Sequence, residues 1–411
     1  MNNISLQKRL NDKETLFALL AFSVLFFLNP LLAIICSTVF IFKHKGQSEA
    51  LQYWLYAFIA IYLGLINTTK VPESDLLSYK EYFDDASYMS LSAYMDLFQQ
   101  EQVFYFLTFV LNKVFFGNFK LYLILTTFIS FFLVFVSIHK FWRTENKNVI
   151  LFSILIFAFW FDFFFGTGFL IRQILAESIF IYFFIEKIVN HKIKWFLIPI
   201  AFFIHSSSLL LFVICFIPKL KEKIGFKNLM ILIMITLIIT IFGSDIIQKL
   251  DILTQGIAGL NYPIRMINSM ALMDYSWYDG KLAKGIRIDY YMFFVIPIVF
   301  SVFFKPKETL IISILNFCII YIGILEFFFV TNLKFMQLRM SYYLPVFIPF
   351  VWPNFFLNKK IFSNTISRNI SMFVFLSFFM FLFANSFFAQ KMHFTSKEEI
   401  FLKPVFFYFL N

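Results

Sequence analysis

Arginine is scarce in this chain of 411 residues, and its positions are therefore informative. Only seven of the 35 basic residues are arginines, so lysine is the usual cation. The guanidinium of arginine differs from a lysine ammonium because its planar set of five donors can bind a phosphate or carboxylate in two places at once. Four arginines fall in segments that the charge pattern assigns to one side of the molecule: Arg172, Arg265, Arg287 and Arg339. They predict a site for an anion, although surface anchoring and ion pairing would also explain them.

A histidine lies in the middle of an apolar run. His205 is followed by three serines, Ser206 to Ser208. A histidine can accept a proton near neutral pH and so act as a general base. No second ligand lies nearby at metal-binding spacing and no nucleophile-elbow glycine pattern is present, so neither a metal site nor a serine hydrolase is predicted. A hydrogen bond to a neighbouring helix is the alternative explanation for His205.

An acidic residue and two tyrosines are spaced to share one face of a helix. Asp75, Tyr79 and Tyr82 lie four and three residues apart, which places their side chains together on a helix. A carboxylate can accept hydrogen bonds from sugar hydroxyls, and tyrosine rings can stack on a sugar ring. The pattern therefore predicts carbohydrate recognition. It is equally typical of a helix at a membrane interface, where tyrosines lie among the lipid headgroups.

The elements that must position these residues are apolar helices. The chain is 60% hydrophobic and 14% charged, with a mean hydropathy of +0.79, whereas globular domains contain about 25% charged residues. A membrane barrel would instead show short alternating segments. The sequence predicts an all-α, polytopic membrane protein with about 10–12 membrane segments, some re-entrant or broken, since each crossing needs roughly 20 residues.

The positions of basic residues orient the expected spans. Short lysine-rich connections mark the cytoplasmic side, which leaves the long loops 67–101 and 244–289 outside. Because the +11 net charge is dispersed between spans, it does not indicate a nucleic-acid partner. We expect a single integral membrane domain covering residues 1–411. The expected spans are residues 15–42, 49–66, 119–141, 149–165, 169–186, 228–243, 290–304, 309–330, 340–356 and 369–388.

Three segments are expected to be broken or short. Residues 195–218 have lysines at both ends, so a hairpin with His205 at its tip is expected to enter and leave on the cytoplasmic side. Such a tip should line a cavity, because non-helical backbone in a membrane needs protein or water around it. A single span with a polar centre is the alternative. Residues 102–116 are expected to form a half-helix. Asn29-Pro30 is expected to kink the first run or to make it fold back on itself.

The order of motifs along the chain resembles that of the EpsG family of polysaccharide polymerases, relatives of the Wzy-type O-antigen and capsule polymerases. The resemblance extends from about residue 50 to 220, with a weaker match near residue 339. The motifs, in order, are Asp75 with Tyr79, Tyr82 and Phe83; Glu101 with Phe104-Tyr105; Gly117-Asn118-Phe119; Arg172-Gln173-x-x-Ala176; His205-Ser206-Ser207; and Arg339-x-Ser341-Tyr342-Tyr343.

The resemblance implies a GT-C-like membrane glycosyltransferase in the bacterial inner membrane. It would polymerise undecaprenyl-diphosphate-linked repeat units at the outer face, without a cofactor or metal, beside a flippase and a chain-length regulator. His205 or Asp75 would assist the acceptor hydroxyl. The residues expected to bind substrate are Arg172, Gln173, Arg339, Tyr79, Tyr82, Glu101, Arg265 and Arg287. A lipid-linked oligosaccharide flippase or transporter, and an O-antigen ligase, are the alternative functions.

Overall fold

The structure is a computed structural model of the chain. It describes residues 2–43, 49–98, 100–145, 147–222, 309–330, 334–357, 362, 364–389, 393–394 and 400–410. Within these ranges the secondary structure is helical, apart from turns and one isolated β-bridge between Lys70 and Phe394. The prediction of an all-α protein is confirmed.

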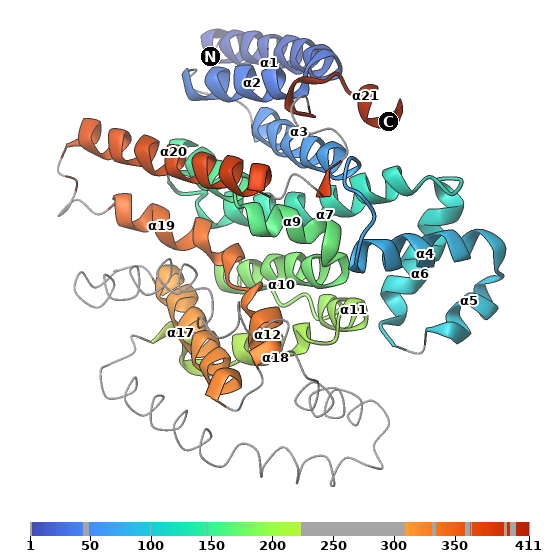
Figure 1. Cartoon of the computed structure of the whole chain (residues 1–411). Helices are drawn as coiled ribbons and strands as arrows, with labels where there is room; N and C mark the ends of the chain where they lie inside the picture. The colour runs from blue at the N-terminus through green and yellow to red at the C-terminus, as the bar shows by residue number, and fades with distance from the viewer. Residues whose placement is uncertain are drawn as a thin grey trace. The chain divides into compact units, whose positions relative to one another are not determined.

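The chain divides into two compact units, and the helices of both are labelled in Figure 1. The first comprises Met1–Ser208 together with Phe362–Asn411, and the second comprises Leu209–Ile361. In the second unit, α17 (Thr309–Val330) contacts α18 (Lys334–Ser341) and α19 (Ile348–Leu357). The first unit contains most of the residues that the sequence motifs single out.

Three helices form the centre of the first unit. The helix α3 (Glu49–Asn67) packs along α7 (Phe119–Phe141), and α7 packs along α10 (Ile171–Val189). A Cβ atom added at Gly64 would lie 3.0 Å from both Cα and the carbonyl oxygen of Ile124. The glycine therefore allows α3 and α7 to touch backbone to backbone, as small residues do between membrane helices.

Several helices have the length and composition of membrane spans. Four described helices qualify, namely α3, α7, α17 and α20 (Thr365–Ala389). A fifth crossing is formed if α8 (Lys147–Ala158) and α9 (Phe161–Phe169) count as one span bent by 52°. These helices confirm the predicted polytopic membrane protein. The expected spans 228–243 and 290–304 lie outside the described residues.

Two predicted interruptions are confirmed. The helix α1 (Asn2–Leu28) is separated from α2 (Pro30–Lys43) by Asn29, whose side-chain oxygen accepts a hydrogen bond from the Leu32 backbone at 3.0 Å. Proline is well suited to the first position of α2, where no backbone donor is needed. His205 likewise interrupts the run between α11 (Leu197–Ile204) and α12 (Ser208–Cys215).

Other expected helix boundaries were wrong. The run 149–165 is not one straight helix, because it bends at residues 159–160 and α9 continues to Phe169. Gly166 and Gly168 favour loops by propensity, but here they leave room for Ile174 and Lys70 to pack against α9. Arg339 does not begin a span: it lies in the last turn of α18, because the chain leaves the helix before the 3-10 turn at Pro345–Phe347.

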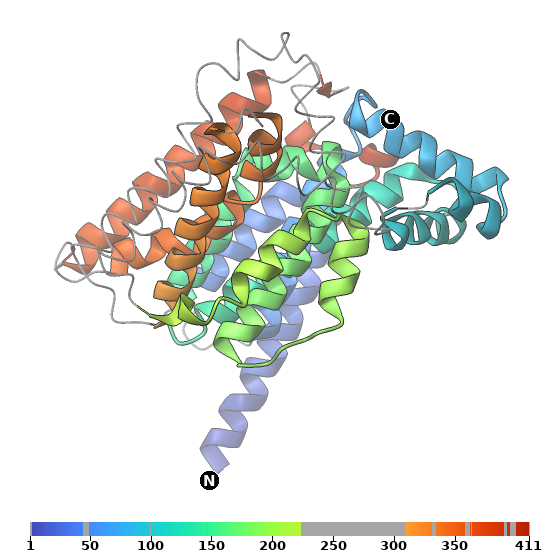
Figure 2. The ribbon, with the colours of Figure 1, turned by 90° about the horizontal axis from the view of Figure 1, so that it is seen from below.

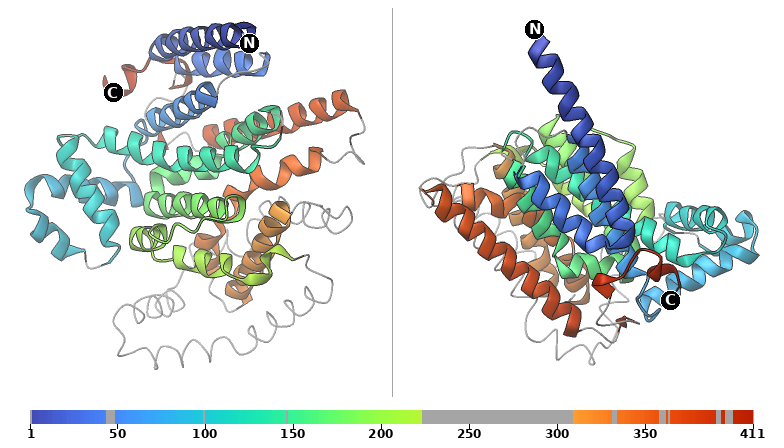
Figure 3. Two further views of the ribbon diagram at one scale, coloured as in Figure 1. Left: turned by 180° about the vertical axis from the view of Figure 1, so that it is seen from behind. Right: turned by 90° about the horizontal axis from the view of Figure 1, so that it is seen from above.

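Three shorter helices project from one end of the first unit (Figures 2 and 3). They are α4 (Asp75–Tyr88), α5 (Leu91–Leu97) and α6 (Gln102–Val114), so α6 is the short helix predicted for residues 102–116. The amide of Asn112 on α6 donates to the Phe83 carbonyl oxygen at 2.6 Å and to Ser87 Oγ at 2.9 Å. These bonds join α6 to α4.

Candidate functional site

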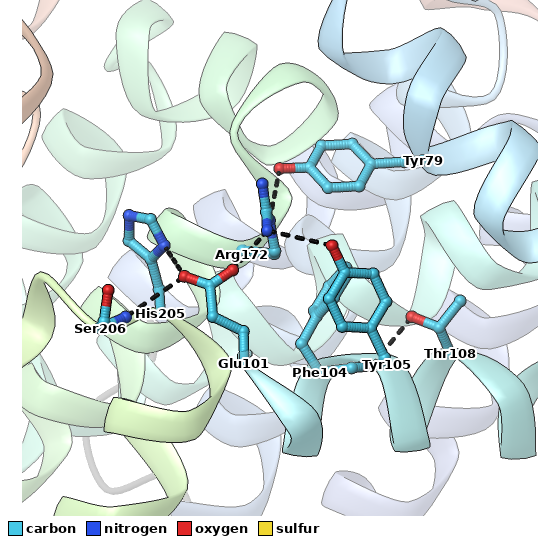
Figure 4. Close-up of polar contacts among 8 residues, drawn as sticks. All are labelled: Tyr79, Glu101, Phe104, Tyr105, Thr108, Arg172, His205 and Ser206. Carbon is cyan, nitrogen blue, oxygen red and sulfur yellow. Dashed lines mark hydrogen bonds and ion pairs between the residues drawn. The ribbon is translucent and has the colours of Figure 1, made fainter. Parts of the chain in front are cut away.

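Glu101 lies at the centre of a polar cluster in the first unit (Figure 4). It immediately precedes α6, with a backbone φ of 53° in the left-handed region. Such a conformation costs about 1–3 kcal/mol for a residue other than glycine and is common at functional sites. The conformation directs the carboxylate toward Arg172 and His205, as Figure 4 shows.

Arg172 is the second residue of α10, so it lies at the start of a helix. Its Nη1 donates to Glu101 Oε2 and, at 3.2 Å, to the hydroxyl of Tyr105. Its Nε donates to the hydroxyl of Tyr79 at 3.3 Å. The guanidinium carbon also lies 5.6–6.0 Å from the ring centroids of Tyr79, Phe104 and Tyr105, within the range of cation–π attraction.

His205 binds the other oxygen of the same carboxylate. Its Nδ1 lies 2.6 Å from Glu101 Oε1, and the backbone N–H of Ser206 donates to that oxygen at 3.3 Å. Both groups reach Glu101 because the chain is extended, not helical, at His205. When Nδ1 carries the hydrogen of this bond, Nε2 is left as a proton acceptor.

The electrostatics favour an ionised Glu101. Burial would raise the pKa of its carboxyl, but the hydrogen bond and charge of His205, the charge of Arg172 and the Ser206 N–H together hold the pKa below its ordinary value. The Glu101 side chain is 10% exposed, against 30% for Arg172 and 25% for His205. Both partners are therefore more accessible than the carboxylate that holds them.

Aromatic rings surround the cluster on the side of α4–α6. Tyr105 stacks on Phe98 at a centroid distance of 3.8 Å, and Tyr82 packs edge-on against both rings at 5.6 and 5.1 Å. Tyr79 packs edge-on against Phe104 at 5.7 Å. The rings fix the tyrosine hydroxyls that contact Arg172, and Tyr82 adds a partly exposed aromatic surface beside them.

The structure brings some of the predicted site residues together and leaves others apart. Tyr79, Glu101, Arg172 and His205 form the cluster. Asp75 begins α4, one turn before Tyr79, and Gln173 is buried on α10. Arg339 belongs to the second unit. Arg265 and Arg287 lie outside the described residues.

Tyr105 was absent from the predicted site residues. Its hydroxyl contacts Arg172 directly. The signal for it was present in the sequence, because Tyr105 belongs to the Glu101 with Phe104-Tyr105 motif of the family resemblance. The described residues contain no group of three or more histidine, cysteine or carboxylate side chains placed to hold a metal ion.

Comparison with known proteins gives one match. A model of the EpsG family matches residues 52–398, which include every residue of the cluster. No curated protein and no solved structure matches the chain.

Proposed function

The chain belongs to the EpsG family of Wzy-like polysaccharide polymerases, and we propose that it joins undecaprenyl-diphosphate-linked oligosaccharide repeat units by glycosyl transfer at the outer face of the bacterial inner membrane. The observation that carries this proposal is the Glu101 carboxylate, which bridges the guanidinium of Arg172 and the imidazole of His205. The bridge places an anion-binding group and a base around one carboxylate.

Arg172 is assigned to the diphosphate of the donor. Glycosyl transfer breaks the bond between the anomeric carbon and the diphosphate oxygen, so negative charge develops on the leaving group. A guanidinium that is already in place stabilises that charge without reorganising. The hydroxyls of Tyr79 and Tyr105 hold the guanidinium in position. The position of Arg172 at the start of α10 adds the positive end of the helix dipole.

His205 is assigned to the acceptor. Its Nε2 would take the proton of the acceptor hydroxyl as the oxygen bonds to the anomeric carbon of the donor. Glu101 then stabilises the imidazolium through Nδ1, as a carboxylate does for a catalytic histidine. Asp75 on α4 is assigned to hydrogen bonds with sugar hydroxyls, and Tyr82 on the same helix to stacking on a sugar ring. Gln173 is assigned to a supporting position beside Arg172.

A deletion strain tests the reaction. Loss of polymer with retention of single repeat units on the final acceptor is expected, because transport and ligation would continue without polymerisation. Loss of a flippase would instead stop repeat units from reaching the surface, and loss of a ligase would leave polymer on the lipid carrier. Either of those two profiles would reject the polymerase assignment.

Complementation ties the reaction to the site. A plasmid carrying His205→Gln should restore single repeats only, whereas one carrying Lys113→Met should restore polymer. Lys113 is an exposed lysine of α6 that lies outside the cluster and donates to the Ser87 carbonyl oxygen. Equal restoration by the two plasmids would disprove the role of His205.

A further inference from the structure

Lys70 is a buried lysine outside the cluster. It follows α3 in a turn and is 4% exposed. Lysine is rarely buried this completely unless it is paired with an acid. Within the described residues no carboxylate forms an ion pair with it, and burial holds its pKa well below the ordinary range.

Carbonyl oxygens and aromatic rings surround the Lys70 amine instead. Its Nζ donates to the Phe165 carbonyl oxygen at 2.9 Å and reaches that of Phe164 at 3.5 Å. The ring centroids of Phe164, Phe165, Phe169 and Phe394 lie 4.8, 4.9, 5.1 and 5.8 Å from Nζ. Four rings at these distances lie within cation–π range of the amine, so they offset part of the cost of burying its charged form.

The carbonyls that bind Lys70 lie in the second half of α9, which ends at Phe169. The chain turns at Leu170, and α10 begins at Ile171 with Arg172 as its second residue. Lys70 therefore binds the helix that leads directly into Arg172.

Neighbouring residues accommodate the Lys70 side chain against α9. A Cβ atom added at Gly168 would lie 2.5 Å from Lys70 Nζ and 2.8 Å from its Cδ, so a larger residue there would displace the lysine side chain. Asn67, three residues before Lys70, donates to Thr167 Oγ1 on α9 at 2.7 Å. From the other side, the β-bridge to Phe394 covers the lysine.

We propose that Lys70 is a positioning residue for Arg172. By binding the carbonyl oxygens of α9, it fixes the corner between α9 and α10, so that the guanidinium of Arg172 meets Glu101. Lys70 itself touches neither substrate nor the reacting atoms. Its effect on polymerisation rests on the proposed function, whereas its effect on the corner does not.

Hydrogen exchange of the purified full-length protein tests the corner without any assay of activity. In Lys70→Met, amides of residues 164–174 should exchange at least about tenfold faster than in the wild type, because local opening becomes easier. The matched control is Lys147→Met, which removes another partly buried lysine that donates to a backbone carbonyl, that of Ile41 at 2.7 Å. Unchanged exchange at 164–174 in Lys70→Met would overturn the proposal.

A double-mutant cycle tests the link to Arg172. Initial polymerisation rates in membrane vesicles supplied with lipid-linked repeat units should fall at least about tenfold in Lys70→Met, because small displacements of a catalytic group are costly. In an Arg172→Lys background the same change should cost less than about twofold, since the interaction is already lost. A further loss of about tenfold in the Arg172→Lys background would show that Lys70 has only a structural role. A normal polymerisation rate in Arg172→Lys alone, together with faster exchange in Lys70→Met, would reject the proposed function. It would still support the role of Lys70 at the corner between α9 and α10.

Discussion

Nδ1 of His205 lies 2.6 Å from Oε1 of Glu101, although 104 residues separate the two positions in the chain. The other carboxylate oxygen binds Arg172. One acidic side chain therefore sets the distance between the proposed base and the proposed anion-binding group.

Arg172→Lys should abolish most polymer while leaving the amount of protein in the membrane unchanged. Lysine keeps the charge but cannot contact Glu101, Tyr79 and Tyr105 together, so a loss of roughly 10²-fold is expected, as for removal of one transition-state donor. Glycan ladders on gels measure the effect. Arg143→Lys, just beyond the C-terminal end of α7, is the control. A normal glycan ladder from Arg172→Lys would show that the residue only anchors the helix to lipid headgroups.

Glu101→Gln should separate turnover from donor binding. The amide preserves the shape of the side chain but stabilises an imidazolium poorly, so kcat should fall by about 10²-fold or more. The KM for the lipid-linked donor should not rise, because Arg172 loses a competing anion. Steady-state rates in vesicles measure both constants. A higher KM at unchanged kcat would show that Glu101 only binds substrate.

The same substitution should have a pH-dependent effect on stability. The pKa of Glu101 lies below its ordinary value of 4.5, so folding favours the carboxylate. The resulting stabilisation is fully present above pH 4.5 and is lost as the pH falls through the lower pKa of the folded state. Thermal melts in detergent should show Glu101→Gln less stable than the wild type at pH 7, with the difference shrinking below pH 4.5. A constant difference would contradict the shifted pKa.

Both ends of residues 195–218 should face the cytoplasm. In a chain without native cysteines, Lys192→Cys and Lys221→Cys should resist an impermeant thiol reagent added from outside, because short lysine clusters stay inside. Asp96→Cys, an exposed position on α5, should react and so report the outer side. Labelling at position 221 with protection at 192 would establish a single crossing and reject the hairpin.

Much of the fold follows from local pattern. The expected spans 49–66, 119–141 and 309–330 agree with α3, α7 and α17 to within one residue, because long apolar runs bounded by polar residues leave few alternatives. The interruptions at Asn29 and His205 were also predictable, since a proline or a polar group in an apolar run disturbs the helix. The bend at residues 159–160 was not, because apolar aromatic residues continue through it.

Which residues belong to the site could be predicted from the sequence better than the contacts among them. Arg172, His205 and Glu101 stand out by residue type and by their order along the chain. That Glu101 binds both of the others depends on where α6, α10 and α11 pack, which no local pattern encodes. Lys70 gave no signal at all, because a lone lysine after a span is indistinguishable from an ordinary loop cation until its phenylalanine neighbours are known.

The backbone contact at Gly64 holds α3 against α7 with no side chain of residue 64 between them. Because α10 packs along α7, these three helices form the group that carries Arg172. Glu101 and His205 instead lie at the ends of the shorter helices α6 and α11. The cluster therefore joins this central group of helices to two short ones, so that a change in the packing at Gly64 would reach it through Arg172.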